Sequence, residues 1–379
     1  MLGDPALVLN MPDKKIVVDS INGVSVADAA QLPMLKAGSV AKVNGHIVNA
    51  DGSQNTDFNG LVNIEVKDTK EKIAGRINNT DPKDGTFSSY VYYDHKKTIF
   101  MGNDSIRSGK FDMTFAVTKD INYADDNGLI NLFAIDSKGV TTANGYSESF
   151  LVGGTADLET DSIGPSIYCY LNTPSFVSGG DVNATPYFVA EISDNDGLNT
   201  SGSGIGHDLQ LVIDDDPKLT FSLNDNFSFE FGSYTKGSTY YNIPELQAGA
   251  HKLRFTAWDI LNNPSSTTLK FNVVRGLTPR LASISCSNNP AKTSTTFIVS
   301  HDRGGSNVDV RIEILDISGR LLWVYEESGV SSTSTYTYNW DLCTSGGGKL
   351  KAGVYLYRVR LSSDGSSEVS KASKIIIVD

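Results

Sequence analysis

Alternation of apolar and polar residues over short runs is the feature that most constrains the fold of this chain. Residues 61–66 alternate between two faces, one of which carries Val62, Ile64 and Val66. Further alternating runs occupy residues 111–117, 128–135, 187–192, 208–213 and 252–259. Turn dipeptides such as Asn127-Gly128 separate these runs, and sustained helical periodicity is absent. The pattern predicts an all-β chain of antiparallel strands.

The length of the chain predicts how these strands are grouped. At roughly 100–200 residues per domain, 379 residues allow two to four domains. We predict three tandem immunoglobulin-like β-sandwich domains, at residues 36–155, 156–276 and 277–379, with residues 1–35 preceding them as a linker. The first six residues have neither the charged nor the apolar region of an export signal, and we expect a fragment of a longer protein.

Charge and hydropathy exclude two classes of protein. The net charge is −12, and residues 278–379 carry 11 Lys and Arg against 10 Asp and Glu, so the first two domains carry the acidic surface. A nucleic-acid-binding protein needs clustered basic charge, which this chain lacks. No run of about 18 apolar residues occurs, so the sequence predicts no transmembrane helix.

Nucleophilic catalysis has little support in the sequence. No Cys-x-x-Cys or His-x-His spacing occurs among the three cysteines and five histidines, which are Cys169, Cys286, Cys343, His46, His95, His207, His251 and His301. We expect the cysteines to be small buried apolar residues without a site that lowers the thiol pKa. The alternative is a small enzyme in which the fold brings Cys169 or Cys286 to a histidine.

Acidic runs raise the question of a metal. Asp194, Asp196 and Gly197 resemble the start of a calcium loop, but the sixth and twelfth positions of an EF-hand are here Asn199 and Ile205. Such an acidic run either forms a solvated turn or binds a structural Ca²⁺ between loops. We expect the solvated turn, with no cofactor and no metal.

Two residues of the second domain are candidates for specific roles. Trp258 falls on the polar face of its strand, where it either stacks on a sugar or is covered by a neighbouring domain or loop, and we expect the second. His207 follows a glycine-rich turn, and we predict a structural role in which it binds Asp194 or Asp196. His207→Ala should then lower the melting temperature of the second domain.

The last strand is the candidate docking element. Residues 375–378 are apolar on both faces, whereas a sandwich strand usually has one polar face. We predict that Ile376 and Val378 point outward beside Val354 and Leu356 and form an exposed apolar patch. An edge strand at the chain terminus also has unpaired backbone groups, which suits strand addition to a partner. The alternative is a central, covered strand.

Several stretches resemble the gingipain-type cysteine peptidases that act as sortases of the type IX secretion system of Bacteroidetes. Residues 2–7 resemble the exit from the caspase-like domain of that family. The region after that domain is matched by residues 58–60, 108–111, 119–123, 152–154, 193–199, 204–208, 248–253 and 257–263. The last domain is similar to type IX C-terminal sorting domains, at residues 289–290, 314–320, 339–341 and 353–358.

This resemblance implies a cell-surface protein associated with the outer membrane. The parent peptidase would remove sorting domains from cargo and attach the cargo to lipopolysaccharide. Its catalytic Cys and His lie upstream of residue 1, so no catalytic residue transfers to this chain, and residues 1–35 become the end of the peptidase domain. The chain would be a non-catalytic stalk that ends in a retained sorting domain.

The same resemblance implies the partners of the stalk. These are the upstream peptidase domain, cargo sorting domains and the outer-membrane shuttle barrel on which the protein docks. One alternative remains open, a surface adhesin or glycan-binding protein that carries a sorting domain. A cargo protein with a cleaved sorting tail would share the last domain but would not explain the first two. We predict that the chain alone has no peptidase activity.

Overall fold

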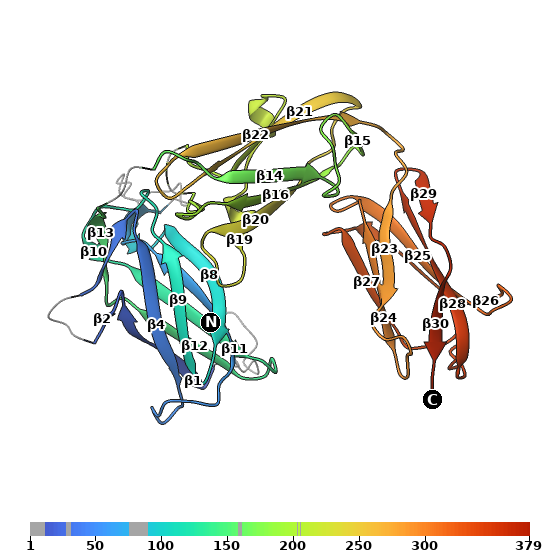
Figure 1. The fold of residues 1–379 in the computed structure, drawn as a ribbon, viewed down its shortest axis with the longest axis horizontal. Coiled ribbons are helices and arrows are strands. Elements are labelled where there is room, and N and C mark those ends of the chain that lie inside the picture. Colours follow the sequence, from blue (N-terminus) through green and yellow to red (C-terminus); the bar gives the residue numbers. More distant parts are fainter. Residues whose placement is uncertain (1–11, 28–31, 76–89, 158–160, 203, 205) are drawn as a thin grey trace, which may run out of the picture.

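The computed structural model describes residues 12–27, 32–75, 90–157, 161–202, 204 and 206–379. Within these ranges the chain is made of strands, apart from two short 3-10 helices, η1 (Pro217–Leu219) and η2 (Asn224–Asn226). Three bodies follow one another, and the second bridges the first and the third (Figure 1). Each body has its own apolar core, so the prediction of tandem all-β domains is confirmed.

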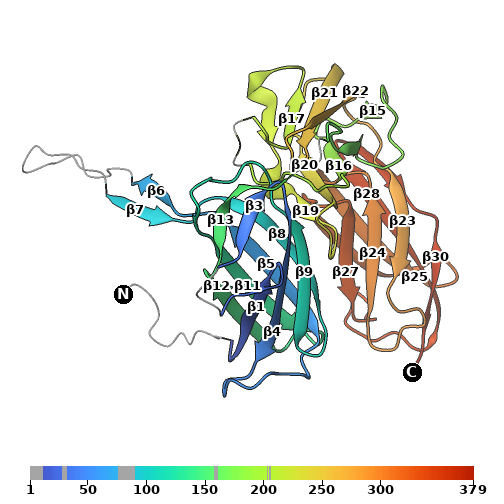
Figure 2. The same cartoon turned by 60° about the vertical axis from the view of Figure 1, so that its left-hand side comes forward.

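The first domain is a rolled sheet with two small additions. Its main sheet has the order β8-β5-β11-β12-β1-β4-β9, a second sheet is β10-β13-β3, and β6 and β7 form a hairpin that projects from the domain (Figure 2). The strands are β1 (Lys14–Ile21), β2 (Val24–Ser25), β3 (Met34–Ala37), β4 (Val40–Val48), β5 (Gly60–Lys67), β6 (Glu71–Ala74), β7 (Val91–Asp94), β8 (Thr98–Ile106), β9 (Lys110–Ala116), β10 (Asp126–Asn127), β11 (Leu129–Asp136), β12 (Thr142–Ser147) and β13 (Leu151–Thr155).

The first domain begins earlier than the sequence predicted. Strand β1 lies between β12 and β4, and its Ile16 and Val18 are buried in the core. Strand β1 is therefore part of the sheet and not a linker, which corrects the predicted boundary at residue 36. The reason is that β1 has a neighbouring strand at each of its two edges, and these strands provide partners for its backbone N–H and C=O groups. Residues 2–7 lie outside the described part of the chain.

The second domain packs two sheets on each other. One sheet has the order β14-β16-β20-β19 and the other β15-β22-β21-β17-β18. The strands are β14 (Ser166–Leu171), β15 (Asp181–Val182), β16 (Tyr187–Ser193), β17 (Gln210–Ile213), β18 (Thr220–Ser222), β19 (Ser228–Phe229), β20 (Lys236–Asn242), β21 (Gly249–Trp258) and β22 (Pro264–Val273). The long β21–β22 hairpin spans the top of the molecule (Figure 1).

The third domain is also a two-sheet sandwich. Its sheets are β23-β24-β27 and β26-β25-β28-β29, and β30 pairs with the other half of the β28 edge. The strands are β23 (Leu281–Cys286), β24 (Thr295–His301), β25 (Asn307–Leu315), β26 (Leu321–Val330), β27 (Thr335–Trp340), β28 (Gly353–Ser363), β29 (Ser366–Val369) and β30 (Ser373–Ile377). No described helix in the molecule is long and apolar enough to cross a membrane.

Candidate functional sites: two domain junctions and one sheet face

The first junction is organised by the carboxylate of Asp120, in the loop after β9. His207 Nδ1 lies 2.9 Å from Asp120 Oδ2 and 3.0 Å from Oδ1. The side-chain amides of Asn199 and Asn262 donate to the same carboxylate at 2.6 and 2.9 Å. Asp120 belongs to the first domain and its three partners to the second. One carboxylate, only 8% exposed, therefore ties two loops of the second domain to the first.

The partner of His207 differs from the prediction. The sequence predicted Asp194 or Asp196, but His207 binds Asp120, which is 87 residues away in another domain. Asp194 instead closes its own turn, since its Oδ1 accepts the backbone N–H of Asp196 at 2.9 Å and of Gly197 at 3.3 Å. A local pattern that forms such a turn contains no information about a carboxylate in the preceding domain.

Trp258 is packed against this junction. The indole is half-buried, and its ring centroid lies 4.5 Å from that of His207, with an angle of 52° between the ring planes. Among the described residues Trp258 Nε1 has no hydrogen-bond acceptor. The His207 loop covers one face of the indole, and that face is not available for stacking on a sugar.

An apolar contact accompanies the polar one. Phe229 of β19 packs on the cores of both the first and the second domain. Its ring centroid is 5.0 Å from that of Phe100 in β8 and 4.9 Å from that of Phe227. A Cβ atom on Gly197 would lie 2.6 Å from the Cβ of Ala116, so the backbones also approach closely. Apolar contacts and a close backbone approach thus accompany the Asp120 hydrogen bonds at the first junction.

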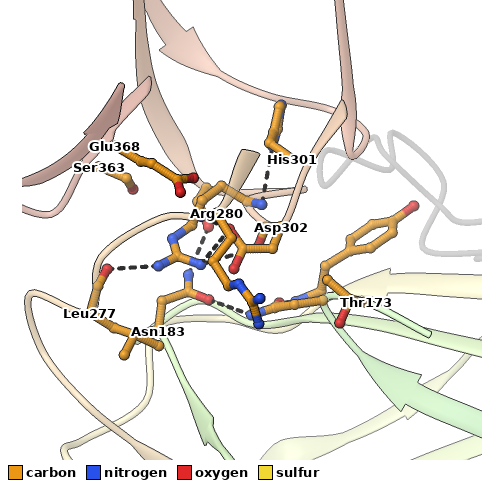
Figure 3. Close-up of polar contacts among 12 residues, drawn as sticks. Thr173, Asn183, Leu277, Arg280, His301, Asp302, Ser363 and Glu368 are labelled. Carbon is orange, nitrogen blue, oxygen red and sulfur yellow. Dashed lines mark hydrogen bonds and ion pairs between the residues drawn. The ribbon is translucent and has the colours of Figure 1, made fainter. Parts of the chain in front are cut away.

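The second junction is centred on Arg303, whose side chain is fully buried. Its guanidinium pairs with Asp302 at 2.8 Å and donates to the backbone carbonyl of Leu277 at 2.7 Å. Asp302 Oδ1 also accepts the backbone N–H of Arg280 at 2.7 Å. Leu277 and Arg280 belong to the segment that links β22 to β23, so this ion pair holds the linker (Figure 3).

The same linker is held from its other side by the β28–β29 hairpin. The backbone N–H of Gly276 donates to Asp364 Oδ2 at 2.6 Å, and Ser366 Oγ donates to the carbonyl of Gly276 at 2.6 Å. The backbone N–H of Leu281 donates to the Glu368 carboxylate. Gly276, Leu277 and Arg280 of the linker, and Leu281 at the start of β23, therefore each have a partner in the third domain.

Direct contacts also join the second and third domains. Asn183 Nδ2 donates to Ser306 Oγ at 2.8 Å, and that hydroxyl donates to the carbonyl of Thr185 at 3.1 Å. Gly305 has a φ of +71°, and a Cβ at this position would lie 2.2 Å from Asn242 Oδ1. A side chain at residue 305 would therefore have to displace the Asn242 side chain, and the positive φ also favours glycine there.

His301 lies beside Arg303 in the second junction. Burial, together with the neighbouring Arg303 charge, lowers the pKa of His301 to about 4. The ring is therefore neutral at pH 7, and its Nδ1 accepts the backbone N–H of Arg303 at 3.1 Å. A protonated Nδ1 is a donor and has no lone pair for this bond.

The predicted docking residues meet on the outer face of the β26-β25-β28-β30 surface. Val354 and Ile376 are direct cross-strand partners, 45% and 40% exposed. Val378 is 39% exposed and Leu356 is half-buried, whereas the intervening Ile375 and Ile377 point into the core. The strand register adds Leu315 and Leu321, which sequence reasoning missed. Leu315 is the cross-strand partner of both Leu356 and Leu321, so all three side chains lie on the same face of the sheet. Leu315 is itself buried, so we call Leu321, Val354, Leu356, Ile376 and Val378 the apolar band.

The free edge of β30 is closed, which corrects the expectation of strand addition. Asn289 Oδ1 accepts the backbone N–H of Ile376 at 2.9 Å, and Asn289 Nδ2 donates to the carbonyl of Lys374 at 2.9 Å. Ala291 donates to the carbonyl of Ile376 and accepts from Val378. The backbone groups predicted to be unpaired therefore have partners, and a ligand would meet the face of the sheet instead of its edge.

Charged residues border the apolar band. Glu313, on β25, accepts from Arg311 Nε at 2.7 Å and from Arg358 on β28. Arg311 also binds Glu326 on β26. The network crosses three adjacent strands, so the outer face divides into a charged half and an apolar half.

The described residues supply neither a metal cluster nor a cysteine–histidine pair. No group of three or more His, Cys, Asp or Glu side chains within the described ranges is placed to hold a metal ion, so the calcium alternative gains no support there. Burial raises the pKa of Cys169 to about 11, which keeps its thiol protonated. The histidines bind groups other than cysteine, namely Asp19, the Asp68 carbonyl, Asp120, Asp214 and Arg303.

Sequence reasoning missed the residues that build both junctions. Asp120 lies within a stretch that carried the family resemblance, but nothing in that stretch identified its partners. Phe229 and Arg303 stand in ordinary alternating or turn sequence. A fully buried arginine is unusual, yet burial is known only once the domains are placed together.

The chain is similar to several solved structures. No protein-family model and no curated protein matches the chain. The crystal structure of dimeric latent PorU from Porphyromonas gingivalis is 33% identical over 99% of this chain, with a TM-score of 0.48, and the chain spans 35% of that protein.

Two other solved structures are similar only at low identity. A tetra-tandem repeat of a large adhesion protein is 13% identical, covering 96% of this chain and 74% of its own, with a TM-score of 0.19. The Bacteroides ovatus glucan-utilisation protein SGBP-B, solved with a mixed-linkage heptasaccharide, is 10% identical, covering 96% and 70%, with a TM-score of 0.26.

Proposed function

We propose that this chain is the non-catalytic stalk and docking region of a cell-surface type IX secretion sortase. The single observation that supports this proposal most is the 33% identity to PorU along nearly the whole chain. In this proposal the peptidase lies upstream of residue 1, acts on cargo sorting domains and transfers the cargo to lipopolysaccharide. The third domain is its retained sorting domain.

The two junctions support the stalk role. Asp120 and Phe229 fix the second domain to the first, and Arg303 and Ser306 fix it to the third. Short covalent linkers without such contacts normally allow the domains to reorient. A spacer with packed junctions would hold the third domain at a fixed position relative to the proposed peptidase domain before the first domain.

The apolar band supports the docking role. Exposed apolar patches with a polar border are typical of protein interaction sites. Since Asn289 and Ala291 close the β30 edge, we propose that the outer-membrane shuttle barrel binds the face of the sheet.

Biolayer interferometry with the purified chain and the shuttle barrel protein tests the docking role. Ile376→Thr with Val378→Thr should weaken binding at least tenfold, or about 1.4 kcal/mol, and leave the melting temperature of the third domain unchanged. Val140→Thr, at an 80% exposed position of the first domain, is the control. Equal binding by both variants contradicts the docking face, and no binding by the wild type contradicts the docking role.

The catalytic assignment has its own test. The purified chain should not cleave a sorting-domain substrate. Specific cleavage that disappears when one of Cys169, Cys286 or Cys343 is replaced by serine would show that the chain itself is a peptidase.

The glycan-binding alternative required an exposed Trp258 beside other aromatic rings. The indole is half-buried against His207, so this residue does not favour that function. Affinity electrophoresis of the chain in polysaccharide gels would detect binding at another surface.

We extend the proposal to assembly. The related PorU structure is dimeric, and we propose that this chain also self-associates.

A further inference from the structure

The outer face of the β14-β16-β20 sheet in the second domain carries a group of tyrosines. Residues two apart on a strand share a face, and the cross-strand register places Tyr170, Val189 and Tyr240 side by side in one row. Tyr240 is 46% exposed, and the other two side chains are half-buried. Bulky side chains on β14 and β20 therefore stand on either side of a smaller one on β16, and together they form a trough.

The trough ends against the third domain. It is a cavity of about 320 Å³ whose lining includes Tyr170, Tyr187, Val189, Tyr240 and Ser334. Ser334 lies between β26 and β27, so the third domain contributes to the end of the trough. In Figure 1 the sheet forms the underside of the second domain, above the space between the first and third domains. The position of the third domain therefore helps to shape this site.

Contacts between the rings hold the walls of the trough in place. The ring centroids of Tyr168 and Tyr170 are 5.7 Å apart, and those of Tyr187 and Tyr240 are 5.8 Å apart. The Tyr168 hydroxyl donates to the Pro174 carbonyl at 2.6 Å. Burial, together with the neighbouring phenols of Tyr240 and Tyr170, raises the pKa of Tyr187 to about 12, as expected for rings that converge on one place. The walls are thus ordered before a ligand arrives.

A carboxylate without a cation stands next to the trough. Glu191 is exposed in the following row of the same face, where it pairs with Tyr168 on β14. Burial, together with the Glu191 charge, raises the pKa of the Tyr170 phenol, so this carboxylate lies close to the wall of the trough. The ion pairs that lysine and arginine side chains form within the described part of the second domain use Asp215 and Glu245 instead.

The surrounding charge also favours a cation. Residues 161–276 contain 13 Asp and Glu against 6 Lys and Arg. On the tyrosine-bearing face, Lys236 stands one row beyond Glu191, opposite Ser193, and forms no ion pair with Glu191 among the described contacts. A positively charged ligand would therefore be attracted to the trough, and an anionic one would be repelled.

The width of the trough suits a flat group. Adjacent strands are about 4.7–4.9 Å apart, so the backbones of β14 and β20 are separated by about 9–10 Å across β16. That separation leaves room for one planar group in van der Waals contact with both walls, at about 3.5–4 Å from each. An arginine guanidinium is planar, stacks on aromatic rings and binds a carboxylate through two hydrogen bonds. A lysine ammonium lacks the flat surface, and a neutral sugar ring lacks the charge.

We propose that the trough binds the arginine side chain of an extended, basic segment of a partner protein. The guanidinium enters between Tyr170 and Tyr240 and pairs with Glu191. This site is separate from the apolar band of the third domain, and the inference does not depend on the stalk, docking or self-association roles.

Fluorescence anisotropy of the full chain with labelled nine-residue peptides tests the site. The first peptide carries three arginines separated by glycine, and the second carries lysine at the same positions. The third carries citrulline, which keeps the planar group and removes the charge. The arginine peptide should bind at least fivefold more tightly than the lysine peptide and at least tenfold more tightly than the citrulline peptide.

Variants of the chain locate the site. Glu191→Gln and Tyr240→Leu should each weaken binding of the arginine peptide at least tenfold, with the melting temperature of the second domain unchanged. Tyr240→Phe keeps the ring and should bind like the wild type. Glu245→Gln is the matched control, because Glu245 is 60% exposed in an ion pair with Arg275 outside the trough, and its affinity should stay within twofold of the wild type.

Other results would overturn the proposal. Equal binding of the arginine and lysine peptides would indicate diffuse charge attraction, and equal losses for Glu191→Gln and Glu245→Gln would place the peptide elsewhere. No binding by the wild type at peptide concentrations up to about 1 mM would mean that the trough does not hold arginine. Binding of neutral maltohexaose that Tyr240→Leu abolishes, without binding of the arginine peptide, would assign the trough to sugars instead.

Discussion

Asp120 shows how much a single side chain contributes to this molecule. Its carboxylate meets one imidazole and two amides, all from the neighbouring domain. The Asn199 side chain that it binds is fully buried, and a buried amide that loses its acceptor carries an unpaired donor. The effect of changing Asp120 should therefore be much larger than that of changing an acid on the surface.

We expect Asp120→Leu to lower the free energy of unfolding by about 2–4 kcal/mol, because it leaves three buried or half-buried donors unpaired. Asp112→Leu is the control, since Asp112 is 52% exposed and pairs only with Lys42 among the described contacts. Its effect should stay within about 1 kcal/mol. Urea unfolding followed by circular dichroism measures both. Similar values for the two variants would contradict a stabilising role of Asp120.

His301 predicts how the third domain responds to acid. Its pKa is about 4 when folded, because the ring is buried beside Arg303, and about 6.5 when unfolded. Between these values the unfolded chain binds a proton that the folded chain does not, so stability falls as the pH falls. The free energy of unfolding is therefore highest above pH 6.5. It falls progressively as the pH is lowered toward 4, by up to about 3 kcal/mol.

Thermal unfolding of the wild type and of His301→Gln between pH 7.5 and 4.5 checks this expectation. A glutamine keeps a hydrogen-bond acceptor but does not titrate in this range. The melting temperature of the variant should therefore decrease less over the acidic range. Parallel pH profiles would show that other groups, and not His301, cause the acid sensitivity.

At the scale of elements, the end of the chain illustrates how a protein closes an open strand edge. The side chain of Asn289 imitates a peptide group, because its oxygen accepts from Ile376 and its amide donates to Lys374. Ala291 continues the pattern with true backbone bonds. The short segment before β24 thus takes the place of a further strand.

Asn289→Ala should free two backbone groups of β30 and destabilise the third domain by about 1–2 kcal/mol. The exposed edge should also increase aggregation on heating, since unpaired edges template further strands. Asn288→Ala, at the neighbouring exposed position, provides the comparison. Differential scanning calorimetry with light scattering records both effects. If the two variants behave alike, the edge-closing role of the Asn289 side chain is wrong.

At the scale of the whole molecule, packed contacts between described residues join the three domains. The first junction combines the Asp120 contacts with Phe229, which packs on two cores. The second combines the buried Arg303 with the close approach at Gly305. Both junctions use the second domain, which spans the molecule between the other two (Figure 1).

Small-angle scattering should therefore fit one conformation of the described domains. Phe229→Ala together with Asp120→Asn should broaden the distribution of interatomic distances and increase the radius of gyration, because the first junction loses its apolar and polar contacts. Val140→Ala, far from either junction, should match the wild type. A wild-type profile that requires an ensemble of domain orientations would contradict the fixed stalk.

The sequence by itself determined the fold class and the inward and outward faces of strands. Val62, Ile64 and Val66 are buried as their spacing predicted, and Ile376 and Val378 face outward. These properties follow from the two-residue period of a strand, which is local. The family resemblance likewise came from sequence alone.

Only the tertiary structure decided which residues meet. The partner of His207, the burial of Arg303 and the sharing of Phe229 all depend on contacts between domains. The closure of the β30 edge by Asn289, 87 residues earlier than Ile376, depends on how the third domain folds back on itself. Periodicity fixes the direction of a side chain relative to its own strand, but the neighbour that it finds is set by packing of distant segments, for which a local pattern carries no signal.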